Sequence, residues 1–215
     1  RTPPWKLEAP TRLAATAGLT MVARKGDLGP TGVTLSNVLG NFISQMNLNG
    51  QIVFDVNYAL GSGSPATTAT EDRAMWIYFP GIGNVELCRE GDATGIPGVV
   101  FRGTSATPFN TGSCTFNSTG TFLAKVDLSG AVTTGVDDAA IFMLSTGGHT
   151  LAARRGDAAP GIAGATLNVF NNTSIQLNDN HEIAFQSSLS GAVTTANDSA
   201  VFAGFVGNLQ LVIRE

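Results

Sequence analysis

The stretch that decides the fold is Asn117-Ser-Thr-Gly-Thr-Phe-Leu-Ala-Lys-Val-Asp-Leu128. Its apolar residues alternate from Phe122 to Leu128, which predicts a strand with one buried face, because successive side chains of a strand point to opposite sides. The Asn-Ser-Thr-Gly at its start predicts a tight turn, since Asn and Gly tolerate a positive φ.

This turn and strand occur three times in the chain. Residues 47–58 begin with Asn-Leu-Asn-Gly, and residues 178–189 begin with Asn-Asp-Asn-His. We interpret Asn47, Asn117 and Asn178 as structural residues of a repeated turn. His181 stands where the other two copies have Gly, so we expect the third turn to be of another type.

An Arg-x-Gly-Asp sequence marks the same period. Gly26, Gly91 and Gly156 are each followed by Asp and are separated by 65 and again 65 residues. A period of this length indicates stacked or radially arranged supersecondary units. We predict that the charged residues of these sequences form structural turns, with an Arg–Asp ion pair in each unit: Arg24, Arg89, Arg154, Asp27, Asp92 and Asp157.

Three further apolar segments accompany each copy of the central strand. The first type lies at 33–39, 99–102 and 165–170, the third at 74–79, 140–144 and 200–205, and the fourth at 19–24, 85–89, 150–154 and 209–214. Four short antiparallel strands per unit are typical of a propeller blade. We therefore predict an all-β fold of three tandem four-stranded antiparallel units of β-propeller-blade type, at about 19–84, 85–149 and 150–215, with an extended N-terminal arm at 1–18.

The patterns Asn-x-x-Gly-x-x-Ala-Phe and Arg-Glu-Gly-Asp-x-x-Pro-Gly resemble the bacterial tandem-repeat family named after its NxxGxxAF motif. The resemblance covers about residues 19–215. Ala184-Phe185 matches the motif, whereas Val53-Phe54 and Leu123-Ala124 depart from it. Because proteins of that family are secreted or lie on the cell surface, the resemblance implies an extracellular or cell-surface location. It implies no catalytic residues.

The composition argues against several classes of protein. Hydrophobic residues make up 43% of the chain and charged residues only 13%, with 26 Gly, which suits short strands and many turns. The net charge is −4 and the basic residues are dispersed, whereas a nucleic-acid partner needs them clustered. No apolar run is long enough to cross a membrane, so we expect no membrane insertion.

Signatures of catalysis are missing from the sequence. We find no Gly-x-Ser-x-Gly elbow, no phosphate loop and no His pair at ligand spacing, and we expect no enzymatic activity. Two Cys and two His do not suffice for a structural zinc site with the usual spacings. Calcium on the repeated acids is an alternative to a protein without cofactors, but Asp side chains that cap turns explain the same pattern.

Other motifs have structural explanations beside the functional ones. Cys88 and Cys114 both fall in the second predicted unit and are a candidate disulfide, worth about 3 kcal/mol for a loop of this length, or else two buried thiols. Arg155-Gly156-Asp157 spells the integrin tripeptide, yet the other units carry the same turn. The candidate glycosylation sites are Asn117, Asn171, Asn172 and Asn197.

The two ends of the array suggest a function. Three blades are fewer than the roughly four to eight of a closed propeller, and open sheets attract other chains. We predict an extracellular structural protein that self-assembles head to tail into a filament or surface layer. The expected contact residues are Trp5, Leu7, Leu13, Leu19, Met21, Leu211 and Ile213.

Two alternatives to this assembly stay open. The arm at 1–18 can instead pack on its own domain and seal the first sheet. The chain can also be a polysaccharide-binding module of the cell surface, with Trp5, Trp76 and Tyr78 as its few aromatic candidates for a glycan.

Overall fold

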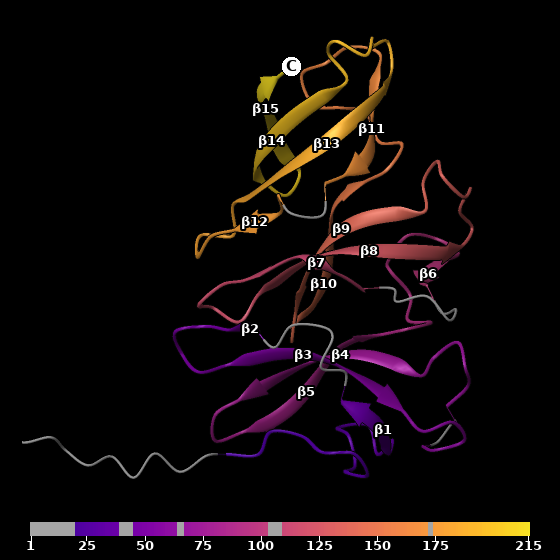
Figure 1. Ribbon diagram of the computed structural model, residues 1–215, viewed down its shortest axis with the longest axis vertical. Helices are drawn as coiled ribbons and strands as arrows, with labels where there is room; N and C mark the ends of the chain where they lie inside the picture. Colours follow the sequence, from indigo (N-terminus) through magenta and orange to yellow (C-terminus); the bar gives the residue numbers. More distant parts are fainter. Residues whose placement is uncertain (1–19, 39–44, 64–66, 103–108, 172–173) are drawn as a thin grey trace, which may run out of the picture.

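A computed structural model describes residues 20–38, 45–63, 67–102, 109–171 and 174–215. This part of the chain is all β, with no helix, and folds into three antiparallel sheets. The sheets follow one another along the long axis of the molecule in the order of the sequence (Figure 1). The predicted fold class is confirmed.

Each sheet is a path of four strands with one more strand paired to its second member. The first sheet has the order β1 (Leu35–Val38), β3 (Ile52–Tyr58), β4 (Arg73–Phe79) and β5 (Gly83–Arg89), with β2 (Gln45–Met46) on β3. The second sheet contains β6 (Val99–Phe101), β8 (Phe122–Gly130), β9 (Ala139–Ser145) and β10 (Gly148–Arg154), with β7 (Phe109–Phe116) on β8. The third has β11 (Ala165–Phe170), β13 (Ile183–Gly191), β14 (Ser199–Phe205) and β15 (Asn208–Arg214), with β12 (Gln176–Leu177) on β13.

The division of the chain into units differs from the predicted one. Strands β5 and β10 pair with β4 and β9, so each closes the sheet that precedes it. The units therefore divide after Arg89 and Arg154, not at 84/85 and 149/150. The physical reason is that a short turn joins the third strand to the fourth, which makes these two neighbours antiparallel partners.

The N-terminal segment also differs from expectation. Residues 20–24 belong to a predicted strand and form none. The predicted arm, with Trp5, Leu7 and Leu13, lies outside the described residues, as does Leu19.

The three Asn turns share one conformation, so the expectation of another turn type at His181 is wrong. The φ angles of Gly50, Gly120 and His181 are 71°, 87° and 64°. His181 is the one non-Gly residue with a positive φ in the described part of the chain. Its backbone N–H donates to the Asn178 carbonyl at 3.1 Å, as Gly50 N–H does to the Asn47 carbonyl. Histidine is among the side chains that tolerate this region better than most.

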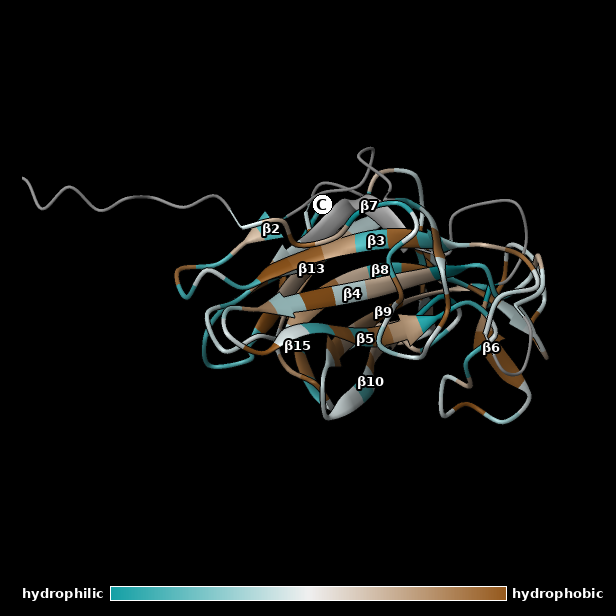
Figure 2. Cartoon of the chain, turned by 90° about the horizontal axis from the view of Figure 1, so that it is seen from below, coloured by the Kyte–Doolittle hydropathy of each residue, from teal (hydrophilic) through white to brown (hydrophobic). Residues whose placement is uncertain are grey.

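The core lies between the sheets. Viewed along the stack, β3, β8 and β13 overlap, and hydrophobic residues concentrate on the strands (Figure 2). One cluster joins the first two sheets, and a second cluster joins the second and third sheets. A third cluster, which contains Trp76, lies on the outward side of the first sheet. Because side chains alternate, the middle sheet contributes one face to each of the first two clusters, and both of its faces are buried. The aromatic members are Phe101, Phe122 and Phe142 in the first cluster and Phe170, Phe185 and Phe202 in the second.

Candidate interaction site

The Gly-Asp turns lead into the three sheets with one hydrogen-bond pattern. The backbone N–H groups of Gly26, Gly91 and Gly156 donate to carbonyls at the start of the next sheet, at 2.9, 3.0 and 2.8 Å. The carboxylates of Asp92 and Asp157 accept the backbone N–H groups three residues earlier, at 2.8 and 2.9 Å. These acids therefore cap the turns.

The repeated arginines do not all form the predicted ion pairs. Arg24 pairs with Asp27 at 3.2 Å, but Arg154 pairs with Asp137, at 2.8 Å. Arg89 donates to the Thr67 hydroxyl, at 2.9 Å. The shared contact is another one, since the Nε groups of the arginines that end β5, β10 and β15 donate to the carbonyl of a turn in the same sheet. These bonds are Arg89 to Glu71, Arg154 to Asp137 and Arg214 to Asn197, at 2.6, 2.8 and 2.9 Å.

The Asn residues of the repeated turns form a ladder that joins the sheets. Asn47 Nδ2 donates to the Asn117 carbonyl at 2.8 Å, and Asn117 Nδ2 donates to the Asn178 carbonyl at 3.1 Å. Each Oδ1 meanwhile accepts two backbone N–H groups of its own turn. On the last rung, Asn178 Nδ2 donates to Glu182 of its own turn instead. The predicted structural role of these residues thus extends to contacts between units.

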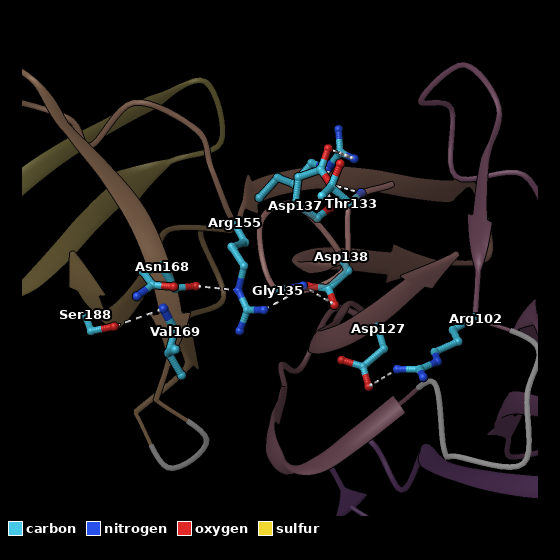
Figure 3. A network of polar contacts seen from close by, with 11 residues as sticks. Arg102, Asp127, Thr133, Gly135, Asp137, Asp138, Arg155, Asn168, Val169 and Ser188 are labelled. Atoms are coloured by element: carbon cyan, nitrogen blue, oxygen red, sulfur yellow. Dashed lines mark hydrogen bonds and ion pairs between the residues drawn. The ribbon is translucent and has the colours of Figure 1, made fainter. Parts of the chain in front are cut away.

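A polar clamp joins the second and third sheets (Figure 3). Arg155 donates from Nη1 to Asp138 at 2.8 Å and from Nε to the Asn168 carbonyl on β11 at 3.0 Å. Nearby, Arg102 and Asp127 approach to 3.7 Å. Arg155 of the integrin-like tripeptide is therefore occupied in holding two sheets together.

The outer face of the third sheet is the candidate interaction site. In each fourth strand a β-bulge places two consecutive residues on the side of the next sheet. In the first two sheets these residues are buried: Leu87 and Cys88 are 7% and 3% exposed, and Ala152 and Ala153 are 9% and 4% exposed. Their equivalents in the third sheet, Val212 and Ile213, are 61% and 63% exposed.

Hollows accompany this open face. The cross-strand pair Ala184–Ala203 occupies the register position of Val53–Ile77 and of Leu123–Met143 in the other sheets. Two Ala side chains fill less space, and a hollow of about 420 Å³ lies beside them. A second hollow, of about 240 Å³, is lined by residues that include Val201 and Ile213. We call the outward side of β13, β14 and β15 the open face.

The predicted contact residues are placed differently by the structure. Ile213 lies on the open face, and Met21 is exposed at the other end of the array. Leu211 packs into the cluster between the second and third sheets, so its prediction as a contact residue is wrong. Residues that sequence reasoning missed are Val212 and the Ala184–Ala203 pair. The sequence contained a signal for Val212: aligning the fourth strands on Arg89, Arg154 and Arg214 places Val212 at the position of Leu87 and Ala152.

The first sheet's opposite face offers little to a glycan. Trp76 is fully buried and donates its indole N–H to the Tyr58 hydroxyl at 2.8 Å. The Tyr58 hydroxyl in turn donates to Glu86. Tyr78 is partly buried against the same cluster, which also contains Val22 and Ala23. The predicted sugar contact by Trp76 is therefore wrong, because its ring is inside the core.

The structure does not contain the predicted disulfide. Cys88 is a free, buried thiol on β5, so the Cys88–Cys114 disulfide is not formed. The two cysteines belong to different sheets, and the side chain of Cys114 lies outside the described residues.

Of the candidate glycosylation sites, Asn117 is buried, and its amide is engaged in the ladder, which leaves no access for a glycan in the folded chain. Asn171 is exposed, Asn197 is partly buried, and Asn172 lies outside the described residues.

Several carboxyl groups are buried beside the first sheet. Burial raises the pKa of Asp55 to about 6, although Arg73 at 2.9 Å opposes the rise. Burial, and then the neighbouring Asp72, raise the pKa of Glu90 to about 8. The Oε2 atom of Glu90 has no hydrogen-bond partner among the described residues. Asp55 lies beside Arg73, and Glu90 lies beside Asp72. The described residues contain no group of three or more His, Cys, Asp or Glu side chains that can hold a metal ion.

The fold defines the class of protein: a stacked array of blade-like β-repeats. Residues 46–215 match the Family of unknown function (DUF7453), and the chain belongs to that family. No curated protein and no solved structure matches the chain. Among the described residues, no helix has the length and hydrophobicity required to cross a membrane.

Proposed function

We propose that this chain is an extracellular structural protein whose copies associate head to tail. The open face of the third sheet of one copy stacks against the N-terminal end of the next copy, where Val22 and Ala23 cover the first sheet and Met21 is exposed. The observation that carries this proposal is the exposure of Val212 and Ile213, whose equivalents are buried in both internal interfaces. A contact between different ends repeats without closing, and the product is a filament or a surface layer.

Continuity with the two internal interfaces supports this partner. The open face has the strand order, the bulge and the register of the faces that are covered inside the chain. The last rung of the Asn ladder also lies at this end, where Asn178 is exposed. A further sheet of the same kind offers its turn carbonyl to this amide, as each internal sheet does.

The size of the face sets the strength of the contact. The three strands of the open face, spaced by about 4.8 Å and running for about six residues, cover roughly 300 Å² per partner. A standard stable interface buries about 800 Å² per partner. Face-to-face stacking alone therefore predicts weak, reversible association, and the arm at 1–18 is proposed to add contacts. The extracellular location rests on the resemblance to the NxxGxxAF family.

The test compares two charge substitutions by light scattering and negative-stain electron microscopy over a range of protein concentrations. Ile213→Asp puts a carboxylate on the open face and is expected to abolish concentration-dependent growth. Val136→Asp, at a residue that is 54% exposed in a turn of the second unit, is the matched control and is expected to assemble normally. A native chain that stays monomeric at every concentration refutes the proposal.

A further inference from the structure

Residues 20–24 stand where the fourth strand of a preceding sheet belongs. The turn that follows them has the hydrogen bonds of the turns that follow β5 and β10, including the bond from the Asp27 N–H to the Arg24 carbonyl at 3.0 Å. Val22 and Ala23, two consecutive residues, both pack against the first sheet. The bulged pair Leu87 and Cys88 packs on the second sheet in the same way.

In the described part of the chain this segment has no sheet of its own. Residues 20–24 form no strand, and the Asn84 side chain holds them to the first sheet through the Val22 carbonyl, at 2.8 Å. Arg24 is 68% exposed and bonds its own neighbour Asp27. The arginines that end β5, β10 and β15 instead bond a carbonyl of their sheet. Residues 20–24 thus have the features of a fourth strand without the sheet that a fourth strand closes.

The sequence of this segment matches that of the last strand. Leu19-Thr-Met-Val-Ala-Arg24 and Leu209-Gln-Leu-Val-Ile-Arg214 share Leu, Val and Arg in register. β15 pairs with β14, with Ile213 opposite Val201 and Leu211 opposite Phe202, and Val212 is the bulge residue between them. The outer edge of β14 can hold one strand only, because each backbone edge pairs with one neighbour.

We propose that head-to-tail association exchanges this strand: residues 20–24 of a second copy replace β15 on β14. The inference rests on the proposed function. After the exchange, Ala23 of the incoming copy lies opposite Val201, and its Arg24 reaches the Asn197 carbonyl that Arg214 occupies in the single chain. The first sheet then follows the third through a Gly-Asp turn, as consecutive sheets do inside the chain.

The exchange supplies what face-to-face stacking lacks. Backbone pairing between copies adds a ladder of hydrogen bonds to a face of modest area, as in strand complementation. The strand that is displaced, β15, has its two bulge residues exposed in the single chain. The incoming segment keeps Val22 and Ala23 packed on its own first sheet.

The first experiment locks β15 in place. A Val201→Cys, Ile213→Cys double variant, in a background without the native cysteines, can form a disulfide within the chain. The two residues lie directly opposite each other on β14 and β15, and the Cα atoms of such a pair are about 4.5–5.5 Å apart, within the range of a disulfide. We expect the reduced variant to assemble and the oxidised variant to remain monomeric in light scattering, with assembly restored by reductant. Equal assembly in both states overturns strand exchange and leaves head-to-tail stacking intact. A native chain that does not assemble overturns both.

The second experiment detects the exchanged pair directly. Chains carrying Ala23→Cys are mixed with chains carrying Val201→Cys, both in the background without native cysteines, and oxidised. The expected product is a disulfide-linked dimer that joins positions 23 and 201. The control replaces Ala23→Cys by Thr20→Cys, which is three residues out of register, and is expected to give only background. Assembly of the mixture without a disulfide between positions 23 and 201 refutes the exchange even where the locked variant fails to fold.

Discussion

The Asn ladder predicts that a buried rung stabilises the array more than the terminal rung. Asn117 accepts hydrogen bonds at Oδ1 from the Thr119 N–H and hydroxyl and from the Thr121 N–H, and donates from Nδ2 to the Asn178 carbonyl. At about 1 kcal/mol for each bond, and with a buried N–H left unpaired, Asn117→Ala should lower the free energy of unfolding by about 3–4 kcal/mol. Asn178→Ala loses turn bonds that are exposed to water and no bond that its side chain makes between sheets, so about 1 kcal/mol is expected.

The assay is urea unfolding followed by circular dichroism, with the chain dilute enough to remain monomeric. At an m-value of about 2–3 kcal/mol/M, Asn117→Ala should move the midpoint down by about 1 M or more. Asn117→Asp keeps the acceptors of the turn and removes the donor to Asn178, so it isolates the bond between sheets and should fall between the other two variants. Equal losses for Asn117→Ala and Asn178→Ala would refute the ladder as a stabilising contact between units.

Three further outcomes are expected. The raised pKa of Glu90, about 8 against an ordinary 4.5, means that the folded state favours the protonated acid; this stabilisation is complete below pH 4.5 and lost as the pH rises to 8. Glu90→Gln should therefore gain thermal stability relative to the native chain between pH 5 and 8, and a difference that stays constant with pH contradicts the assignment. Gly130 has a φ of 89°, and a Cβ there would lie 2.3 Å from the Gly98 carbonyl oxygen, whereas Gly135 has a φ of 77° and open space around it. Gly130→Ala should thus destabilise clearly more than the cost of about 1–2 kcal/mol expected for Gly135→Ala, as measured by thermal unfolding. Cys88 is buried and burial raises its pKa, so in a chain whose other cysteine is replaced it should react with a thiol reagent only after denaturant is added; rapid labelling of the native chain would show that the first interface opens.

The period-two strands and the recurring turns were predictable because they depend on local chemistry. Alternation from Phe122 to Leu128 fixes which face of a strand is apolar, wherever that strand finally lies. The Asn-x-x-Gly turn was predictable from the tolerance of Asn and Gly for positive φ. The expectation that the turn needs Gly was wrong at His181, which adopts the same positive φ. Its ring reaches the Thr119 and Thr121 hydroxyls of the preceding turn, at 3.2 and 3.0 Å. That compensation comes from a neighbouring unit and is invisible in the local sequence.

The site shows the same division. Ile213 was predicted as a contact residue and lies on the open face. Leu211, two residues earlier, packs against the cluster between the second and third sheets, because the bulge at Val212 changes the side to which the strand's residues point. The arginines were expected to pair with acids, yet their common partner is a carbonyl about 17 residues earlier that only strand pairing brings near.

The sequence by itself determined the number of repeats, the four strands on the path of each sheet and the residues that form their turns, because each depends on propensities acting over a few residues. It did not indicate the fifth strand of each sheet, β2, β7 or β12. Only the tertiary structure decided which strand closes which sheet, which faces the stack buries, and which end remains open. Those outcomes depend on long-range pairing and on side chains that meet across sheets. The same apolar pair is therefore core at Leu87 and Cys88 and solvent-exposed surface at Val212 and Ile213.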